Sequence, residues 1–182
     1  MGKGSVITDP CKTCRGQGKT ETTKTLSINV PPGVETGTRL KLVGEGELGG
    51  AGAQPGDLYV VINVSAHPFF AREGREIVCE VPISFVQAAV GDEIEVPTLE
   101  GKVNMKIPSG TQPGKVLRLK GKGFPELGRY GRGDQHVIIK VEVPSSLSAK
   151  QKELLKEFDK ECDESAHPMR RGFFDKLKEL FG

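Results

Sequence analysis

Apolar and polar residues alternate over two long stretches of the chain, which is the pattern of half-buried β-strands. The alternating apolar positions of the first stretch fall into three runs, which are Leu26, Ile28 and Val30, then Leu40 and Leu42, then Leu58, Val60, Ile62 and Val64. Those of the second stretch are Val103, Met105 and Ile107, then Leu117 and Leu119, then Val137, Ile139, Val141 and Val143. Each run predicts one strand.

The two stretches are copies of one unit. Residues 30–64 align with residues 107–141 at a constant offset of 77 and without a gap, and twelve positions are identical. Roughly two identities would be expected by chance over a segment of this length. Five of the twelve shared residues are Gly and one is Pro. Both residue types are typical of turns, because Gly tolerates a positive φ and Pro has a fixed φ. We therefore expect a mainly β fold, with two small β-sandwich or barrel-like domains in tandem.

After Pro144 the period changes to that of a helix. Ser148 is a candidate N-cap, and Gln151 three residues later completes a capping box. A second helix is expected from Gly172, and its apolar face contains Phe173, Phe174, Leu177, Leu180 and Phe181. Because a helix of about ten residues is marginal alone in water, this face must dock. The partner is either a second copy of the chain or the chain's own second β-domain.

Composition and charge exclude several classes of function. Of the 182 residues, 27% are charged and 36% hydrophobic, which is ordinary globular composition. No apolar run is long enough for a bilayer, and no secretion signal opens the sequence, so we expect a cytoplasmic protein without a membrane partner. The net charge is only +2, and the basic run at Lys115, Arg118, Lys120 and Lys122 is typical of a solvated strand face. We expect no nucleic-acid partner.

No catalytic constellation is visible, so we expect no enzyme. None of the three His residues stands beside a plausible Ser or Cys nucleophile. The glycine-rich residues 44–52 lack the Lys and Ser or Thr of a phosphate-binding loop and open no helix, so they predict a hairpin loop.

The cysteines are few and unevenly placed. Cys11 and Cys14 form a C-x-x-C pair followed by Gly16 and Gly18, which is typical of half a zinc knuckle, because a tetrahedral site needs four ligands. A redox pair is the alternative, although no helical pattern follows Gly18 as it does in thioredoxin-like units. The isolated Cys79 and Cys162 are expected to be small packed residues or unpaired thiols.

These motifs together resemble DnaJ-type (heat-shock, type I) co-chaperones. The C-x-x-C-x-G-x-G sequence from Cys11 is similar to the repeated unit of that family's zinc-finger region, and residues 2–4 resemble the end of a preceding unit. Residues 28–34, 44–46, 56–58 and 67–74 resemble the first carboxy-terminal β-domain, residues 81–144 the second, and residues 172–181 the tail of bacterial members.

The resemblance implies four segments. Residues 1–18 would be a remnant of the cysteine-rich zinc-finger region, and residues 19–73 an incomplete first β-domain. Residues 74–144 would be the second β-domain, and residues 145–182 a helical dimerisation tail. The sequence has no counterpart of the J-domain, whose His-Pro-Asp tripeptide is not matched by His67-Pro68-Phe69 or His167-Pro168-Met169. Also without a counterpart are the Gly/Phe linker, three of four cysteine pairs and the opening strands of the first β-domain, so we expect a fragment.

The function that the resemblance implies is binding of unfolded or non-native polypeptide clients and their delivery to a DnaK-type ATPase chaperone, in protein folding and the stress response. The resemblance also implies a homodimer held by the tail residues above. Zinc would be the cofactor of the intact family protein, with Cys11 and Cys14 as ligands, but held weakly or not at all without the partner pair. Two other functions stay open: a C-x-x-C thiol-disulfide oxidoreductase, and a dimerisation module without client binding.

Phe70 aligns with an aromatic residue of the family's client groove. Its neighbour Phe69, together with Leu40, Leu42 and Ile62, completes the candidate client-binding set. Core packing is the alternative for Phe70, and also for Leu40, Leu42 and Ile62, because alternating strand residues usually face a core.

Overall fold

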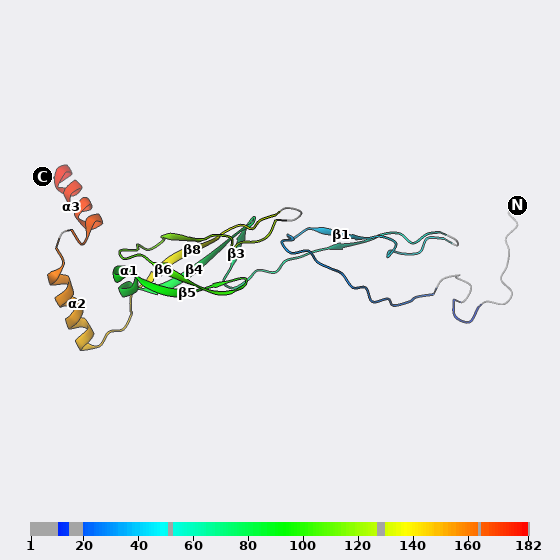
Figure 1. Cartoon of the computed structure of the whole chain (residues 1–182), viewed down its shortest axis with the longest axis horizontal. Coiled ribbons are helices and arrows are strands. Elements are labelled where there is room, and N and C mark those ends of the chain that lie inside the picture. The colour runs from blue at the N-terminus through cyan, green and yellow to red at the C-terminus, as the bar shows by residue number, and fades with distance from the viewer. Residues whose placement is uncertain (1–10, 15–19, 51–52, 127–129, 164, 182) are drawn as a thin grey trace.

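A computed structural model describes residues 11–14, 20–50, 53–126, 130–163 and 165–181, with eight strands and three helices among them. Residues 20–64, residues 71–144 and the carboxy-terminal helices follow one another along the long axis of the molecule (Figure 1). We call residues 20–64 the first β-unit and residues 71–144 the second β-unit. The prediction of a mainly β fold with a helical carboxy-terminal segment is confirmed.

The first β-unit is a single hairpin. Strands β1 (Arg39–Leu42) and β2 (Leu58–Val61) pair antiparallel and form a two-stranded sheet. The expected hairpin loop lies between Leu42 and Leu58, and a bridge pairs Leu48 with Pro55 within it. None of the described residues of this unit is buried.

The second β-unit contains the core. Its elements are β3 (Ala71–Glu73), β4 (Glu76–Ser84), α1 (Phe85–Val90), β5 (Asp92–Thr98), β6 (Gly101–Ile107), β7 (Val116–Leu119) and β8 (Gln135–Glu142). The larger sheet has the order β3-β4-β8-β7, in which β4 and β8 run parallel, and β5 and β6 form a separate hairpin. The core cluster is made of residues between 79 and 139, and Cys79 is one of them, as expected.

The duplication is confirmed in three dimensions. The pairing of Arg39 with Val61 in the first unit recurs as that of Val116 with Ile138 in the second, at the same offset of 77. Both copies also share a turn in which an Asp carboxylate accepts a backbone N–H. Asp57 accepts from Gly44 at 3.0 Å and Asp134 from Gly121 at 2.7 Å. A hydrogen bond from Lys41 and the one from Gly44 lower the pKa of Asp57.

One predicted strand is wrong. Residues 26–30 alternate as strands do, yet they form none, whereas their counterparts at 103–107 lie in β6. Strand β6 is paired along its whole length with β5, but no described strand pairs with residues 26–30. A strand whose backbone groups lack a partner is not stable in water. The segment stays beside the hairpin through Lys24, whose Nζ lies 2.6 Å from the Glu45 carboxylate.

Two helices follow the second β-unit. Helix α2 (Ala149–Glu161) begins at the predicted Ser148 cap, and its capping box with Gln151 is present. Helix α3 (Pro168–Phe181) begins four residues before the expected Gly172. The earlier start is explained by Pro168, because Pro is favoured in the first turn of a helix, where its missing N–H costs nothing. Among the described residues, no helix has the length and apolarity needed to span a membrane.

Candidate functional site

The first β-unit has an open sheet edge along β2. In the second unit, Ile139 donates its N–H to Lys115 beside β7, while the carbonyl of Asp134 accepts from Ile77 at the start of β4. Successive residues of β8 therefore bond alternately to its two neighbours. Tyr59 and Val61 are the counterparts of His136 and Ile138, whose backbone groups face β4. The N–H and C=O groups of Tyr59 and Val61 therefore point to the side that β4 occupies in the second unit. No described strand lies there in the first unit.

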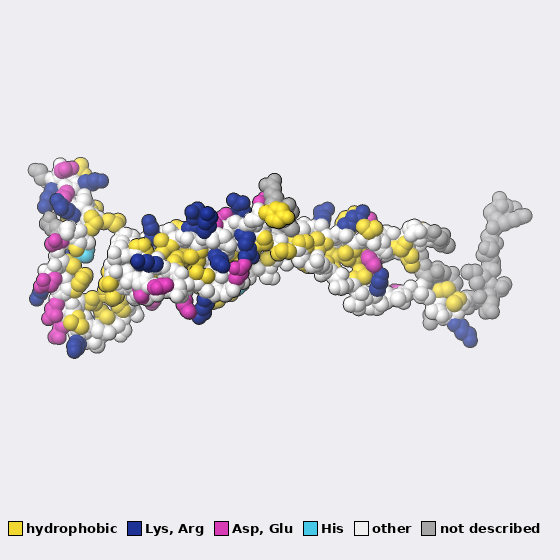
Figure 2. All heavy atoms as spheres, viewed as in Figure 1, with side chains coloured by type: hydrophobic (Ala, Val, Ile, Leu, Met, Phe, Trp, Pro, Cys, Tyr) yellow, Lys and Arg dark blue, Asp and Glu magenta, His cyan; other side chains and the backbone are white. Residues whose placement is uncertain are grey.

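Apolar side chains lie along this edge. Leu40, Leu42 and Ile62 are only half-buried, as is Val60. Their counterparts on β8, Val137 and Ile139, are 0% exposed, because β4 and the second unit's hairpin cover them. Tyr59 and Val61, on the other face of the hairpin, are 58% and 61% exposed. Figure 2 shows hydrophobic side chains reaching the surface along both β-units and the helices.

The residues of the open edge were missed by sequence reasoning. Tyr59 and Val61 have no motif of their own, and β-strand edges carry no signal in a single sequence. Two signals pointed to this edge: the internal repeat, which makes β2 the counterpart of β8, and the resemblance, which leaves the opening strands of the first β-domain without a counterpart in the sequence.

The two candidate aromatic residues lie in different environments. Phe70 is half-buried against the core cluster of the second β-unit, and its ring stacks on His67 with a centroid distance of 4.9 Å. Phe69 is 71% exposed. The structure therefore places Phe70 against the second unit, while Leu40, Leu42 and Ile62 lie on the first.

Substitution of Phe70 by Ala should lower stability, whereas substitution of Phe69 should not. Phe70→Ala is expected to lower the free energy of unfolding by about 2 kcal/mol, since the loss for a fully buried Phe is roughly 3–5 kcal/mol. Phe69→Ala should leave it unchanged, because the ring is mostly in water. Thermal unfolding followed by circular dichroism measures both variants. Equal melting temperatures for the two variants would contradict the packing described here.

The apolar face of α3 is exposed along its whole length. Phe173, Phe174, Leu177, Leu180 and Phe181 are between 40% and 84% exposed, and no residue of α2 or α3 is buried. The rings of Phe173 and Phe174 contact edge to face at 5.5 Å. Docking of this face onto the chain's own second β-unit, the alternative to dimerisation, is therefore not seen among the described residues.

Cys11 and Cys14 are chemically suited to bind a metal but supply too few ligands. Cys11 is exposed, and its pKa is lowered to about 7. The main cause is a hydrogen bond from the backbone of Cys14 to its sulfur, followed in size by one from the backbone of Thr13. The thiolate is the form that binds zinc. Within the part of the chain that the structure describes, no group of three or more His, Cys, Asp or Glu side chains is arranged to hold a metal. The pair fits half of a tetrahedral zinc site.

We expect the purified chain to hold well under one zinc per molecule. Two ligands cannot replace the four that a structural zinc needs, so affinity should be weak. Elemental analysis after gel filtration gives the ratio, and Cys11→Ser is the matched control. A full equivalent of zinc that survives mild chelation in a monomer would contradict this prediction; half an equivalent in a dimer would instead indicate one ion shared by two chains.

Comparison with known proteins agrees with this geometry. The model of the DnaJ C terminal domain family matches residues 6–144, and that of the chaperone protein DnaJ C-terminal region matches residues 150–182. The chain is 62% identical over 159 residues to the chaperone protein DnaJ of Syntrophotalea carbinolica, covering 87% of this chain and 43% of that protein. It is 52% identical over 178 residues to that of Desulfitobacterium hafniense, covering 98% of this chain and 47% of the relative. The chain thus spans about half the length of its relatives, and it belongs to the DnaJ C-terminal domain family.

Proposed function

We propose that this chain binds unfolded or non-native polypeptides as the client-binding part of a DnaJ-type co-chaperone. The observation that carries the proposal is the open edge of β2, lined by apolar side chains whose counterparts in the second β-unit are covered. The role requires no catalysis. The relatives are named chaperone proteins, which supports the same class of function.

Binding at this edge would be strand addition. An extended client segment would accept and donate main-chain hydrogen bonds at Tyr59 and Val61, while its alternate side chains would contact the half-buried apolar face. Main-chain pairing is independent of the client's sequence, and apolar contacts favour segments that a folded protein would hide. Both properties suit a protein that must recognise many unfolded clients.

Two further parts of the proposal rest on the family alone. Delivery of the client to a DnaK-type ATPase in the cytoplasm would require the J-domain of the intact family protein. Dimerisation through α3 would place two client-binding edges in one molecule, and two linked sites bind one long client more tightly than either alone.

The proposal is tested by blocking the edge without removing its side-chain neighbours. Val61→Pro removes the outward N–H and fills the edge with a ring, while the inward bonds of β2 to β1 remain. We expect at least a tenfold loss of affinity for reduced, carboxymethylated α-lactalbumin, measured by fluorescence anisotropy. The matched control is Val61→Thr, which keeps the N–H and the β-branched shape and should bind as the parent chain does. If both variants bind equally well, strand addition at β2 is excluded.

A second candidate function is thiol-disulfide exchange, which the low pKa of Cys11 favours. A thiol with a pKa near ambient pH is well suited to attack a disulfide. Reduction of a small aromatic disulfide by the parent chain but not by Cys11→Ser would support it. Equal rates for the two proteins would exclude this function without affecting the client-binding proposal.

A further inference from the structure

The side chain of Arg72 joins the two β-units. This residue lies in the short strand β3, which belongs to the sheet of the second unit and stands at the end of that unit nearer to β1 (Figure 1). Its guanidinium group crosses to the first unit. Nη1 donates to the carbonyl of Val34 at 2.6 Å, and Nη2 donates to the carbonyl of Gly33 at 2.8 Å.

Nη2 of the guanidinium group also lies 3.1 Å from the Glu35 carboxylate of the first unit, and the other contacts of the group are with the second unit. Its Nε donates to the carbonyl of Gly74 at 2.7 Å, and the ring of Phe124 lies against the guanidinium carbon at 4.4 Å from the ring centroid. The side chain is 23% exposed. A planar guanidinium group that donates several hydrogen bonds has one favourable orientation. It therefore fixes the groups that it binds relative to one another.

Gly33 provides a second, independent contact between the units. A Cβ at this position would come closer than 3.0 Å to the carbonyl oxygen of Pro125 in the second unit. Its counterpart in the repeat, Gly110, has a similar positive φ, yet a Cβ there would meet nothing within 4 Å. The close approach at Gly33 is therefore a property of the junction and not a demand of the repeated turn.

The repeat also shows why the turn at Gly33 needs a contact that its counterpart does not. In the second unit the corresponding turn is held by α1, through hydrogen bonds from Gly110 to Ala89 and from Thr111 to Ala88. The first unit has no described helix at that place, and there Arg72 binds the turn through its carbonyls instead of its N–H groups. We propose that Arg72 is a positioning residue that locks the first β-unit onto the second and so sets the angle between them.

The proposal does not depend on client binding, and its test measures geometry. Spin labels are placed at Arg39→Cys in β1 and Glu93→Cys in β5, both exposed positions, with Cys11, Cys14 and Cys162 changed to Ser and the buried Cys79 retained. The parent chain should give one narrow distance distribution by pulsed electron paramagnetic resonance. Arg72→Ala, Arg72→Lys and Gly33→Ala should each broaden it at least twofold.

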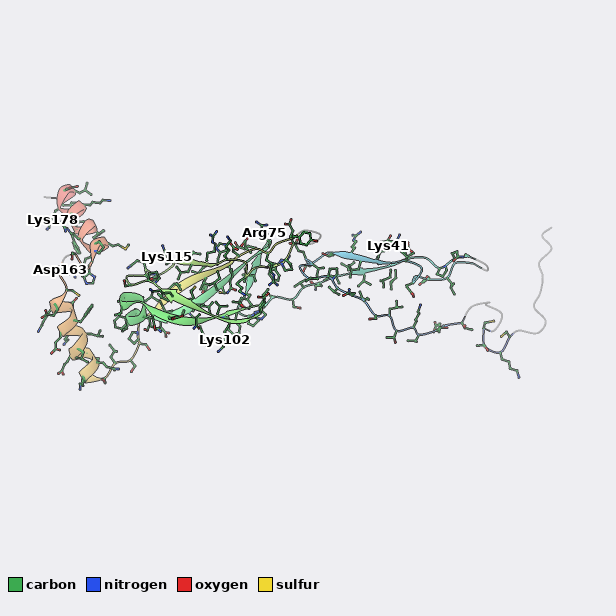
Figure 3. The ribbon with its side chains drawn as sticks, in the orientation of Figure 1. Lys41, Arg75, Lys102, Lys115, Asp163 and Lys178 are labelled. Atoms are coloured by element: carbon green, nitrogen blue, oxygen red, sulfur yellow. The ribbon has the colours of Figure 1, made fainter. Side chains whose placement is uncertain are left out.

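Two matched variants serve as controls. Arg75→Ala removes a neighbouring arginine that is 61% exposed and pairs only with carboxylates of the second unit, Glu76 and Glu126, among its described ion pairs. Figure 3 shows this residue at the same end of the second unit. Gly110→Ala carries the same backbone strain as Gly33→Ala without the contact. Both controls should keep the narrow distribution. The proposal is overturned if the distance distributions of the Arg72 and Gly33 variants are as narrow as that of the parent chain, or if all five variants broaden equally. If Arg72→Ala loses its circular dichroism signal, the result for Gly33→Ala decides.

Discussion

Deletion of residues 168–182 is expected to convert a dimer of this chain into a monomer that keeps both β-units folded. The deleted helix α3 exposes six large apolar side chains, Met169 and the five of the predicted apolar face, and burying each of those five is worth roughly 1.5–3 kcal/mol. Their sum is comparable with the roughly 4–15 kcal/mol that association costs. Sedimentation velocity at micromolar concentration measures the change, and circular dichroism reports the fold.

Two point substitutions test whether the dimer depends on the apolar face of α3 or responds to any added negative charge. Leu177→Glu places a charge on the apolar face of α3 and should give a monomer. Lys176→Glu changes the adjacent polar position and should leave the dimer intact. A monomeric parent chain, or a dimer that survives the deletion, would contradict the prediction. If α3 instead docks on its own second β-unit, the deletion should lower that unit's melting temperature.

Gly133→Ala is expected to destabilise the second β-unit strongly. A Cβ at Gly133 would lie closer than 3.0 Å to the carbonyl oxygen of Arg75, just before β4. Overpacking against backbone costs roughly 1–3 kcal/mol and occasionally more. For a unit of this size the melting temperature should fall by about 5–20 °C. Differential scanning calorimetry measures the shift.

The repeat supplies the matched control for this substitution. Gly56 is the counterpart of Gly133, and a Cβ there would meet only the carbonyl oxygen of Glu47, at 3.7 Å. Gly56→Ala should therefore leave the melting temperature within about 2 °C of the parent value, which corresponds to a few tenths of a kcal/mol. A large effect at Gly56, or none at Gly133, would show that the two copies do not differ in the way described.

Much of the local structure was predictable from the sequence because local signals decide it. The hairpin turns follow from glycines such as Gly44 and Gly121, which adopt a positive φ in both copies. The start of α2 follows from the reciprocal hydrogen bonds of Ser148 and Gln151. The early start of α3 was missed, although Pro168 carried a usable signal.

Burial was not predictable, and the two copies show why. Val60 and Val137 are the same residue in the same repeat position, yet one is half-buried and the other fully buried. Alternation tells which side chains share a face, but only neighbouring strands decide whether water reaches that face. For the same reason the alternation of residues 26–30 predicted a strand that the structure lacks.

By itself, the sequence determined the duplication, the mainly β class, the caps and turns, and the family, because each of these depends on residues near one another or on motifs in order. Only the tertiary structure decided that the edge of β2 is open and that Arg72 joins the two units. Both features depend on contacts between residues far apart in the chain, such as Arg72 and Val34. No local pattern encodes such contacts, because their energy exists only once the separate elements have met.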